Sequence, residues 1–239
     1  MKAFQPWLAA AALLVLLGGC AQPSKKQAFN REMASTIKTV VIAQRPNQTE
    51  YMVDIVAHPG QSFGLVGGLF EDLEGLAKMN RLTAVINPVE TRLQDRFSAK
   101  LSERLVAAGY ATKLVVLPSI SPKNDELLAK VKAQADGDAV LAIAVYGRYR
   151  AAGVSSFYLP QVAVRARLLN SATGAVLYEE SIDYGFTMAP SDSVVLPSDP
   201  QYRFATFEAL LADPVKAREG LLIGLDPLAA QVAADLKRN

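Results

Sequence analysis

A short glycine-rich segment contains the residues that could support nucleophilic catalysis. Gly60-Gln61-Ser62-Phe63-Gly64 matches the pattern G-x-S-x-G, in which a serine nucleophile stands on a sharp turn between a strand and a helix. That serine needs a base, and in such enzymes an acid and then a histidine follow it in the chain. The only histidine, His58, precedes Ser62. We therefore favour a structural role, in which the glycines permit a tight turn, and keep a small serine esterase-like hydrolase using Ser62 as an alternative.

The single cysteine, Cys20, points to a different chemistry. It follows an apolar run from Leu8 to Leu17 and the small residues Gly18 and Gly19. The run is too short to cross a bilayer as a helix and is typical of a signal peptide. The arrangement resembles the bacterial lipobox. The resemblance implies cleavage before Cys20, attachment of a lipid to its thiol, and acylation of the amine freed by cleavage, for example with palmitate. We predict a signal peptide over residues 1–19 and a mature chain anchored to a membrane without spanning it.

The residues after Cys20 suggest where the mature chain is held. Ala21, rather than aspartate, follows the cysteine, and the same resemblance implies the periplasmic face of the outer membrane. The inner membrane stays open as the alternative. Residues 20–34 are polar and basic, so we expect a lipidated, disordered tether there. Residues 35–239 then form a single periplasmic domain.

Composition argues against several classes of function. The chain has 25 basic and 23 acidic residues, and loss of Lys2 with the signal peptide leaves it nearly neutral, which gives no electrostatic basis for nucleic-acid binding. A lipid on Cys20 leaves no thiol for a disulfide or a zinc site, and a single histidine argues against a histidine-based metal site. The densest acidic cluster, Glu71, Asp72 and Glu74, is typical of a solvated helix face. We expect no metal, no cofactor and no catalysis.

Alternating apolar patterns predict the elements that hold these residues. Apolar and β-branched runs predict strands, and apolar residues at helical spacing predict helices. The expected strands are 37–43, 51–56, 110–117, 138–149, 161–169 and 175–184. The expected helices are a segment ending near Met79, then 87–109, 124–135, 203–211 and 214–237, with Pro227 kinking or dividing the last. The run Ala139–Val145 is so apolar that we place it in the middle of the sheet.

The clearest expected helix spans residues 87–109. Asn87 is a good N-cap, Pro88 suits the first helical position, Glu90 is placed for a capping box, and Gly109 suits the C-terminus. One apolar stripe recurs every four residues and should pack on the sheet: Val89, Leu93, Phe97, Leu101 and Leu105.

Beside that stripe lies a row of cations that we call the basic ridge: Arg92, Arg96, Lys100 and Arg104. Their four-residue spacing places them on one side of the helix, where they could meet phosphate headgroups or an acidic partner. We name them as candidate partner-binding residues. The alternative is a solvated flank whose aliphatic stems cover the edge of the core.

Two further segments carry specific expectations. Residues 161–184 alternate as a β-hairpin, and a simple register places Arg165 near Glu179. The proline-containing residues 186–201 predict a long loop. The glycine-rich residues 60–68 are interpreted as core packing, with self-association or membrane contact as the less favoured alternative.

The order of elements predicts an α/β fold, with helices packed on a mixed sheet. Four segments carry a resemblance to a family: Lys38–Ala43, Leu101–Tyr110, Asp136–Leu141 and Thr173–Tyr178. Over residues 38–184 the chain resembles bacterial lipoproteins and domains of the class that includes the TolB amino-terminal domain, the curli-export lipoprotein and the lipoprotein activators of penicillin-binding proteins. The resemblance implies a non-catalytic accessory or scaffold that binds an envelope protein complex in cell-wall synthesis, assembly or export. A homo-oligomeric export component is a further alternative.

Overall fold

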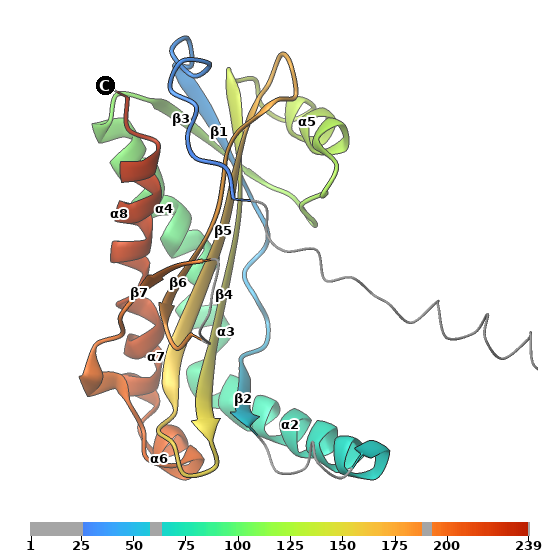
Figure 1. Ribbon diagram of the computed structural model, residues 1–239, viewed down its shortest axis with the longest axis vertical. Helices are drawn as coiled ribbons and strands as arrows, with labels where there is room; N and C mark the ends of the chain where they lie inside the picture. The colour runs from blue at the N-terminus through green and yellow to red at the C-terminus, as the bar shows by residue number, and fades with distance from the viewer. Residues whose placement is uncertain (1–25, 58–63, 188–192, 239) are drawn as a thin grey trace, which may run out of the picture.

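A mixed seven-stranded β-sheet organises the structure, a computed structural model that describes residues 26–57, 64–187 and 193–238 (Figure 1). The strands run in the spatial order β3-β1-β4-β5-β6-β7, and β2 also pairs with β4. They are β1 (Thr39–Gln44), β2 (Met52–Ala57), β3 (Ala111–Val116), β4 (Ala139–Gly153), β5 (Leu159–Asn170), β6 (Val176–Gly185) and β7 (Val194–Leu196). Strand β1 is parallel to its neighbours β3 and β4, and β2 is parallel to β4, whereas β5 runs antiparallel to both β4 and β6. The predicted α/β class with a mixed sheet is confirmed.

The long strand β4 is central, as predicted from its apolar run. On one side Ala139–Arg150 pair with β5, and on the other side β1 pairs with Ala139–Ile143 while β2 pairs with the part that begins at Arg148. Between these two partners, β4 has an interval without a neighbouring strand on that side. Two glutamine side chains fill it. Gln94 Oε1 accepts from the Val145 N–H (2.9 Å), and Gln48 bonds both the N–H and the C=O of Gly147 (2.7 and 2.9 Å).

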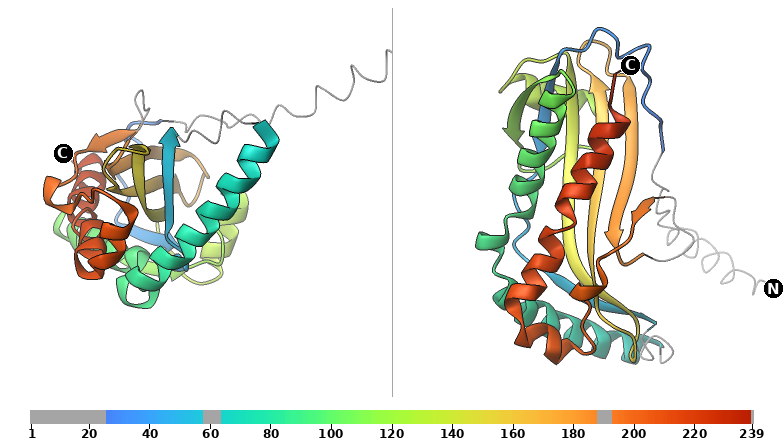
Figure 2. Two further views of the ribbon diagram at one scale, coloured as in Figure 1. Left: turned by 90° about the horizontal axis from the view of Figure 1, so that it is seen from below. Right: turned by 90° about the vertical axis from the view of Figure 1, so that its left-hand side faces the viewer.

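Helices cover the two faces of the sheet unequally. They are α2 (Gly64–Ile86), α3 (Pro88–Thr91), α4 (Leu93–Ala107), α5 (Asn124–Lys132), the 3-10 turn η2 (Pro200–Tyr202), α6 (Phe207–Ala212), α7 (Pro214–Leu222) and α8 (Leu225–Asp235). Helices α4 and α8 lie side by side on one face and enclose the larger core, while α5 covers only part of the other face (Figures 1 and 2). Helix α2 crosses the lower end of the sheet (Figure 2). Among the described residues, no helix covers the rest of the second face.

The expected single helix over residues 87–109 is wrong at its start. The chain breaks at Arg92, whose φ of 44° is left-handed, so a one-turn helix α3 precedes α4. Asn87 also has a positive φ, and its amide bonds the Glu90 side chain (2.9 Å) instead of capping a backbone N–H. Val89, expected on the buried stripe, is 81% exposed. The rest of the stripe, from Leu93 onward, is buried as predicted, and α4 is followed by a positive φ at Gly109.

The expected hairpin is confirmed, but its register differs. Arg165 lies opposite Ser181 and Arg167 lies opposite Glu179, and the pairing shifts by one residue at a bulge between Leu168 and Leu169. The expected loop over residues 186–201 contains the short strand β7 and part of η2. The last helical region divides just before Pro227, which lies in the first turn of α8.

Residues 26–34, expected within a disordered tether, are held against the sheet. Gln27 exchanges two backbone hydrogen bonds with Glu179 (2.8 and 2.9 Å), and the Asn30 N–H donates to the Leu177 carbonyl oxygen. Lys26 pairs with Glu180 at 3.1 Å. Phe29 in this segment is buried, and the apolar surface it removes from water favours the docked conformation.

Candidate functional site

The basic ridge lies on α4, where each of its residues has a contact within the chain. Arg92 pairs with Asp95 (2.7 Å), and Arg96 donates to the Glu90 carbonyl oxygen (3.3 Å). Lys100 and Arg104 both reach Asp226 at the start of α8. Three of the four cations therefore form ion pairs within the chain, and Lys100 and Arg104 share one carboxylate. Binding of a partner through the ridge stays a prediction.

Asp226 connects the two helices that enclose the larger core. The hydrogen bond from Arg104 (2.8 Å) and the weaker one from Lys100 (3.4 Å) hold the pKa of Asp226 below its usual value. The carboxylate also lies in the first turn of α8, where the helix dipole favours a negative charge. This part of the ridge joins α4 to α8.

Asp95 fixes the segment that connects β1 with β2. Burial raises the pKa of Asp95, but hydrogen bonds from Asn47, Arg92 and Gln44 outweigh that effect and leave the pKa lowered. The Asn47 side chain also accepts from the Asp95 N–H (3.1 Å). These contacts join β1 to α4 beside the interval in β4.

Several predicted sites lie outside the described residues. Cys20, His58 and Ser62 belong to this group, so lipidation and the esterase alternative stay predictions. Within the described part of the chain, no group of three or more His, Cys, Asp or Glu residues could hold a metal ion. In that same part, no helix has both the length and the apolar character that a membrane span requires.

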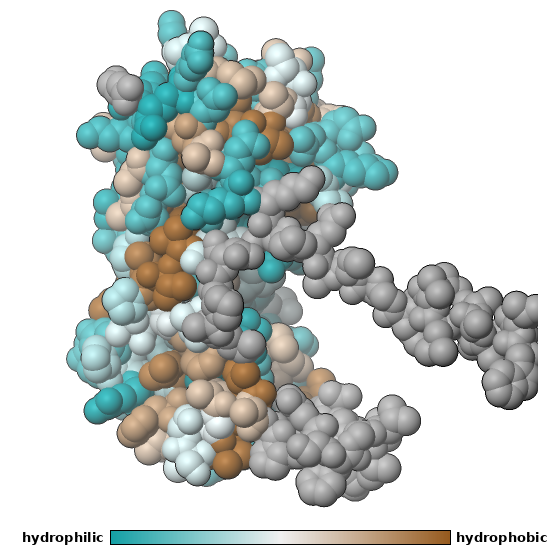
Figure 3. All heavy atoms as spheres, viewed as in Figure 1, coloured by the Kyte–Doolittle hydropathy of each residue, from teal (hydrophilic) through white to brown (hydrophobic). Residues whose placement is uncertain are grey.

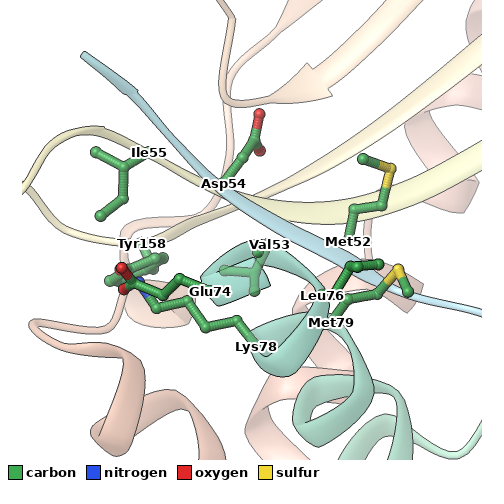
Figure 4. Close-up of a pocket in the computed structure, with 10 residues that line it drawn as sticks. Met52, Val53, Asp54, Ile55, Glu74, Leu76, Lys78, Met79 and Tyr158 are labelled. Atoms are coloured by element: carbon green, nitrogen blue, oxygen red, sulfur yellow. The ribbon is translucent and has the colours of Figure 1, made fainter. Parts of the chain in front are cut away.

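An apolar groove opens between β2 and α2, at the lower end of the sheet (Figure 4). Its volume is about 490 Å³. We call it the β2–α2 groove, and its lining residues are Met52, Val53, Asp54, Ile55, Glu74, Gly75, Leu76, Lys78, Met79 and Tyr158. Met52 and Leu76 are 53% and 52% exposed, which is unusual for large apolar side chains. The groove therefore presents apolar surface to solvent from both a strand and a helix.

The charged side chains of this groove are paired with neighbours. Asp54 accepts two hydrogen bonds from Arg150 Nε and one from its Nη2, at 2.7 to 3.0 Å. Glu74 and Lys78 form an ion pair one helical turn apart (2.5 Å). Because these charges are matched locally, the surface left for a partner is mainly apolar.

Strand β2 also offers a backbone edge beside the groove. Within the described part of the chain, β4 is the only strand that pairs with β2. An edge strand with exposed apolar side chains is a typical site for another extended segment to pair. Apolar side chains also lie at the lower end of the face seen in Figure 3. At the β4–β5 turn, Val154 and Phe157 are exposed.

Sequence reasoning predicted β2 as a weak strand and did not identify its edge. A local signal existed, because Met52 and Val56 leave the strand apolar on both faces, interrupted only by Asp54. That pattern alone also fits a strand buried on both sides. The edge position depends on β2 pairing with β4 beyond the end of β1, which no local pattern encodes.

No protein-family model matches the sequence, and no curated protein matches it. Among solved structures, the chain is similar to the PelC dodecamer from Paraburkholderia phytofirmans, at 14% identity over 91% of this chain and 95% of that one, with a TM-score of 0.31. It is also similar to protein XCC0632 from Xanthomonas campestris (12% identity, 90% and 91% covered, TM-score 0.36). The lipoprotein GNA1162 from Neisseria meningitidis matches at 16% identity over 61% of this chain and 81% of that one, with a TM-score of 0.23. Because these identities and TM-scores are low, we infer function only from the residues of this chain.

Proposed function

We propose that this protein is a lipid-anchored, non-catalytic accessory protein of the bacterial cell envelope that binds a protein partner in the β2–α2 groove. Cys20 holds it on the periplasmic face of the outer membrane. The observation that carries the proposal is the exposed apolar groove beside the edge of β2 that pairs with no strand among the described residues. Exposed apolar surface of this kind is uncommon on a protein that acts alone.

The geometry specifies the chemistry of the partner segment. An extended segment pairs with the edge of β2 through its backbone and places alternate side chains in the groove. Those side chains are apolar, since Asp54, Glu74 and Lys78 already have partners within the chain. The flexible side chains of Met52 and Met79 can adapt to apolar side chains of different shapes, so the groove can bind a partner through apolar contacts.

Site-specific photo-crosslinking in the native envelope tests the proposal. A photoreactive residue replaces Leu76 in the groove, and a matched variant carries it at Val106 on α4, which is 54% exposed. We expect capture of one envelope protein from position 76 and not from position 106. Introducing Met52→Lys into the position-76 variant should abolish the adduct, because a charge then faces the apolar segment.

The outcomes separate the alternatives. Equal capture from both positions, or an adduct that survives Met52→Lys, would exclude the groove as the binding site. Adducts formed only between copies of the chain would favour the homo-oligomeric export component. A small serine hydrolase using Ser62 is assayed separately, by labelling with a fluorophosphonate and by loss of that label in Ser62→Ala.

A further inference from the structure

A second groove lies on the face of the sheet opposite α4 and α8. Side chains of β4, β5 and β6 project into it, next to the part of that face covered by α5. Its volume is about 660 Å³, and the small side chains of Ala144 and Ala163 contribute to its floor. We call it the arginine groove, because four arginines line it: Arg45, Arg148, Arg165 and Arg167.

These four guanidinium groups have no ion-pair partner among the described residues. Three of them bond neutral oxygen atoms, which orient the groups and leave their charges unbalanced. Arg45 donates to the Tyr146 hydroxyl (2.5 Å), Arg148 to the Gln161 amide oxygen (2.7 Å), and Arg167 to the backbone carbonyls of residues 121 and 122 (2.7 and 2.9 Å).

Carboxylates of the same groove offset part of this charge. Glu179 and Asp183 line it, and Glu180 is neutralised by Lys26. Four guanidinium groups against two unpaired carboxylates leave a surplus of two positive charges. Burial lowers the pKa of Arg148, and the nearby charges of Arg150 and Arg165 lower it further, against the opposite effects of Asp54 and Asp183. An anion beside Arg148 would relieve this repulsion.

The attachment of the amino-terminal segment places this groove near the anchor. Lys26 pairs with Glu180, and Gln27 pairs with Glu179, and both acidic residues line the groove. Six residue steps separate Cys20 from Lys26, so the extended chain between them spans at most about 20 Å. A lipid on Cys20 therefore keeps this rim within about 20 Å of the bilayer surface.

We propose that the arginine groove binds the phosphate of an anionic phospholipid headgroup in the membrane that carries the anchor. The proposal rests on the lipid anchoring that forms part of the proposed function. Guanidinium groups match phosphate oxygens in charge and in the geometry of paired hydrogen bonds. Two headgroups, with one negative charge each, would balance the surplus. The open face of the sheet then turns towards the bilayer.

A single tryptophan in the arginine groove can report headgroup contact. The chain's only tryptophan is Trp7, within the predicted signal peptide, so Tyr146→Trp gives the processed protein one tryptophan at the groove. The lipidated protein is reconstituted into vesicles of phosphatidylcholine, with or without phosphatidylglycerol. Each preparation carries a trace of lipid with a nitroxide on its headgroup. Phe157→Trp, on the β4–β5 turn, is the matched reporter away from the groove.

We expect phosphatidylglycerol to increase quenching of the groove tryptophan and not of the reporter at position 157. Arg165→Gln should raise the phosphatidylglycerol content needed for half-maximal quenching about five-fold, since one cation near an anionic surface contributes about that factor. Arg96→Gln is the matched control, because it removes an exposed cation of the basic ridge. Urea unfolding of both variants establishes that they fold.

Each other result overturns the proposal. Equal quenching of the two reporters excludes the groove, and a larger effect of Arg96→Gln than of Arg165→Gln assigns membrane contact to the basic ridge. A response of the groove tryptophan to inorganic phosphate without one to phosphatidylglycerol assigns a soluble anion. Failure of the purified protein to float with any vesicle contradicts the lipid anchor itself, which is a separate result from flotation without quenching.

Discussion

Replacement of Gln94 by methionine should destabilise the protein by about 2 kcal/mol. Gln94 is 1% exposed, and its Oε1 accepts the Val145 N–H at 2.9 Å in the interval of β4 between β1 and β2. Methionine has a similar volume and cannot replace this acceptor, so little of the change comes from a cavity. A buried N–H without a partner costs about 1–3 kcal/mol.

Urea unfolding measures this free energy, with an unchanged slope expected because the surface exposed on unfolding is the same. Amide hydrogen exchange at Val145 gives an independent local measurement and should become faster. Ser98→Ala is the control. It removes only the bond from Gln94 Nε2 to the Ser98 hydroxyl (3.2 Å) and leaves the Val145 N–H bonded to Gln94 Oε1, so the local protection of the Val145 amide should be retained.

Two results would refute this reasoning. A change of less than about 0.5 kcal/mol in Gln94→Met would mean that the Val145 N–H finds another acceptor or does not need one. An equal loss of protection at the Val145 amide in Ser98→Ala would mean that the Gln94–Ser98 bond, and not the acceptor Gln94 Oε1, determines exchange at Val145.

Three further predictions concern other parts of the molecule. A double-mutant cycle of Arg104→Ala and Asp226→Ala should give a coupling of about 0.5 kcal/mol at pH 7, because the pair is largely exposed. Since the folded pKa of Asp226 is lowered, this stabilisation is present above the ordinary carboxyl pKa and is lost as pH falls through the folded value, which urea unfolding across acidic pH would show. Gly185→Ala should lower the melting temperature, because Gly185 has a φ of +90° and an added Cβ would collide with the Pro160 carbonyl oxygen. Cys20→Ser should move the protein from the membrane fraction to the soluble periplasmic fraction, as cell fractionation with immunoblotting would measure.

Local patterns predicted the elements whose environment is uniform along their length. The apolar run Ala139–Val145 correctly indicated the central strand, because the side chains of Ala139–Ile143 are buried on both faces of β4. The alternation in residues 161–184 indicated a hairpin, since one face packs on helices and the other is more polar. The position of Gly109 indicated the end of α4, because its positive φ suits glycine.

Other features depend on contacts between distant residues. The apolar stripe continues across Arg92, so its periodicity concealed the left-handed break. The register of Arg165 depends on how the turn between Asn170 and Ala175 closes and on the bulge between Leu168 and Leu169. Gln94 serves a strand 51 residues away, and no pattern around a single glutamine identifies that partner.

The candidate sites show the same division. The sequence located the basic ridge on a helix flank, but Asp226, which lies 122 residues beyond Arg104, engages its last two cations. The arginine groove escaped notice because Arg45, Arg148 and Arg165 come from different strands and connections. Only the pairing of β4 with β5 brings the last two to one face.

The docked amino-terminal segment also has a mechanical consequence. In a chain anchored at Cys20, tension reaches the domain first at the Lys26–Glu180 ion pair and the two backbone bonds between Gln27 and Glu179. Breaking these contacts, and then the Asn30–Leu177 hydrogen bond and the packing of Phe29 and Ala34, releases the segment up to Ile37 and lengthens the extended span from about 20 Å to about 60 Å. The segment docked on the edge of β6 would thus detach under tension. The maximum distance between the bilayer and the domain would then increase with the applied force.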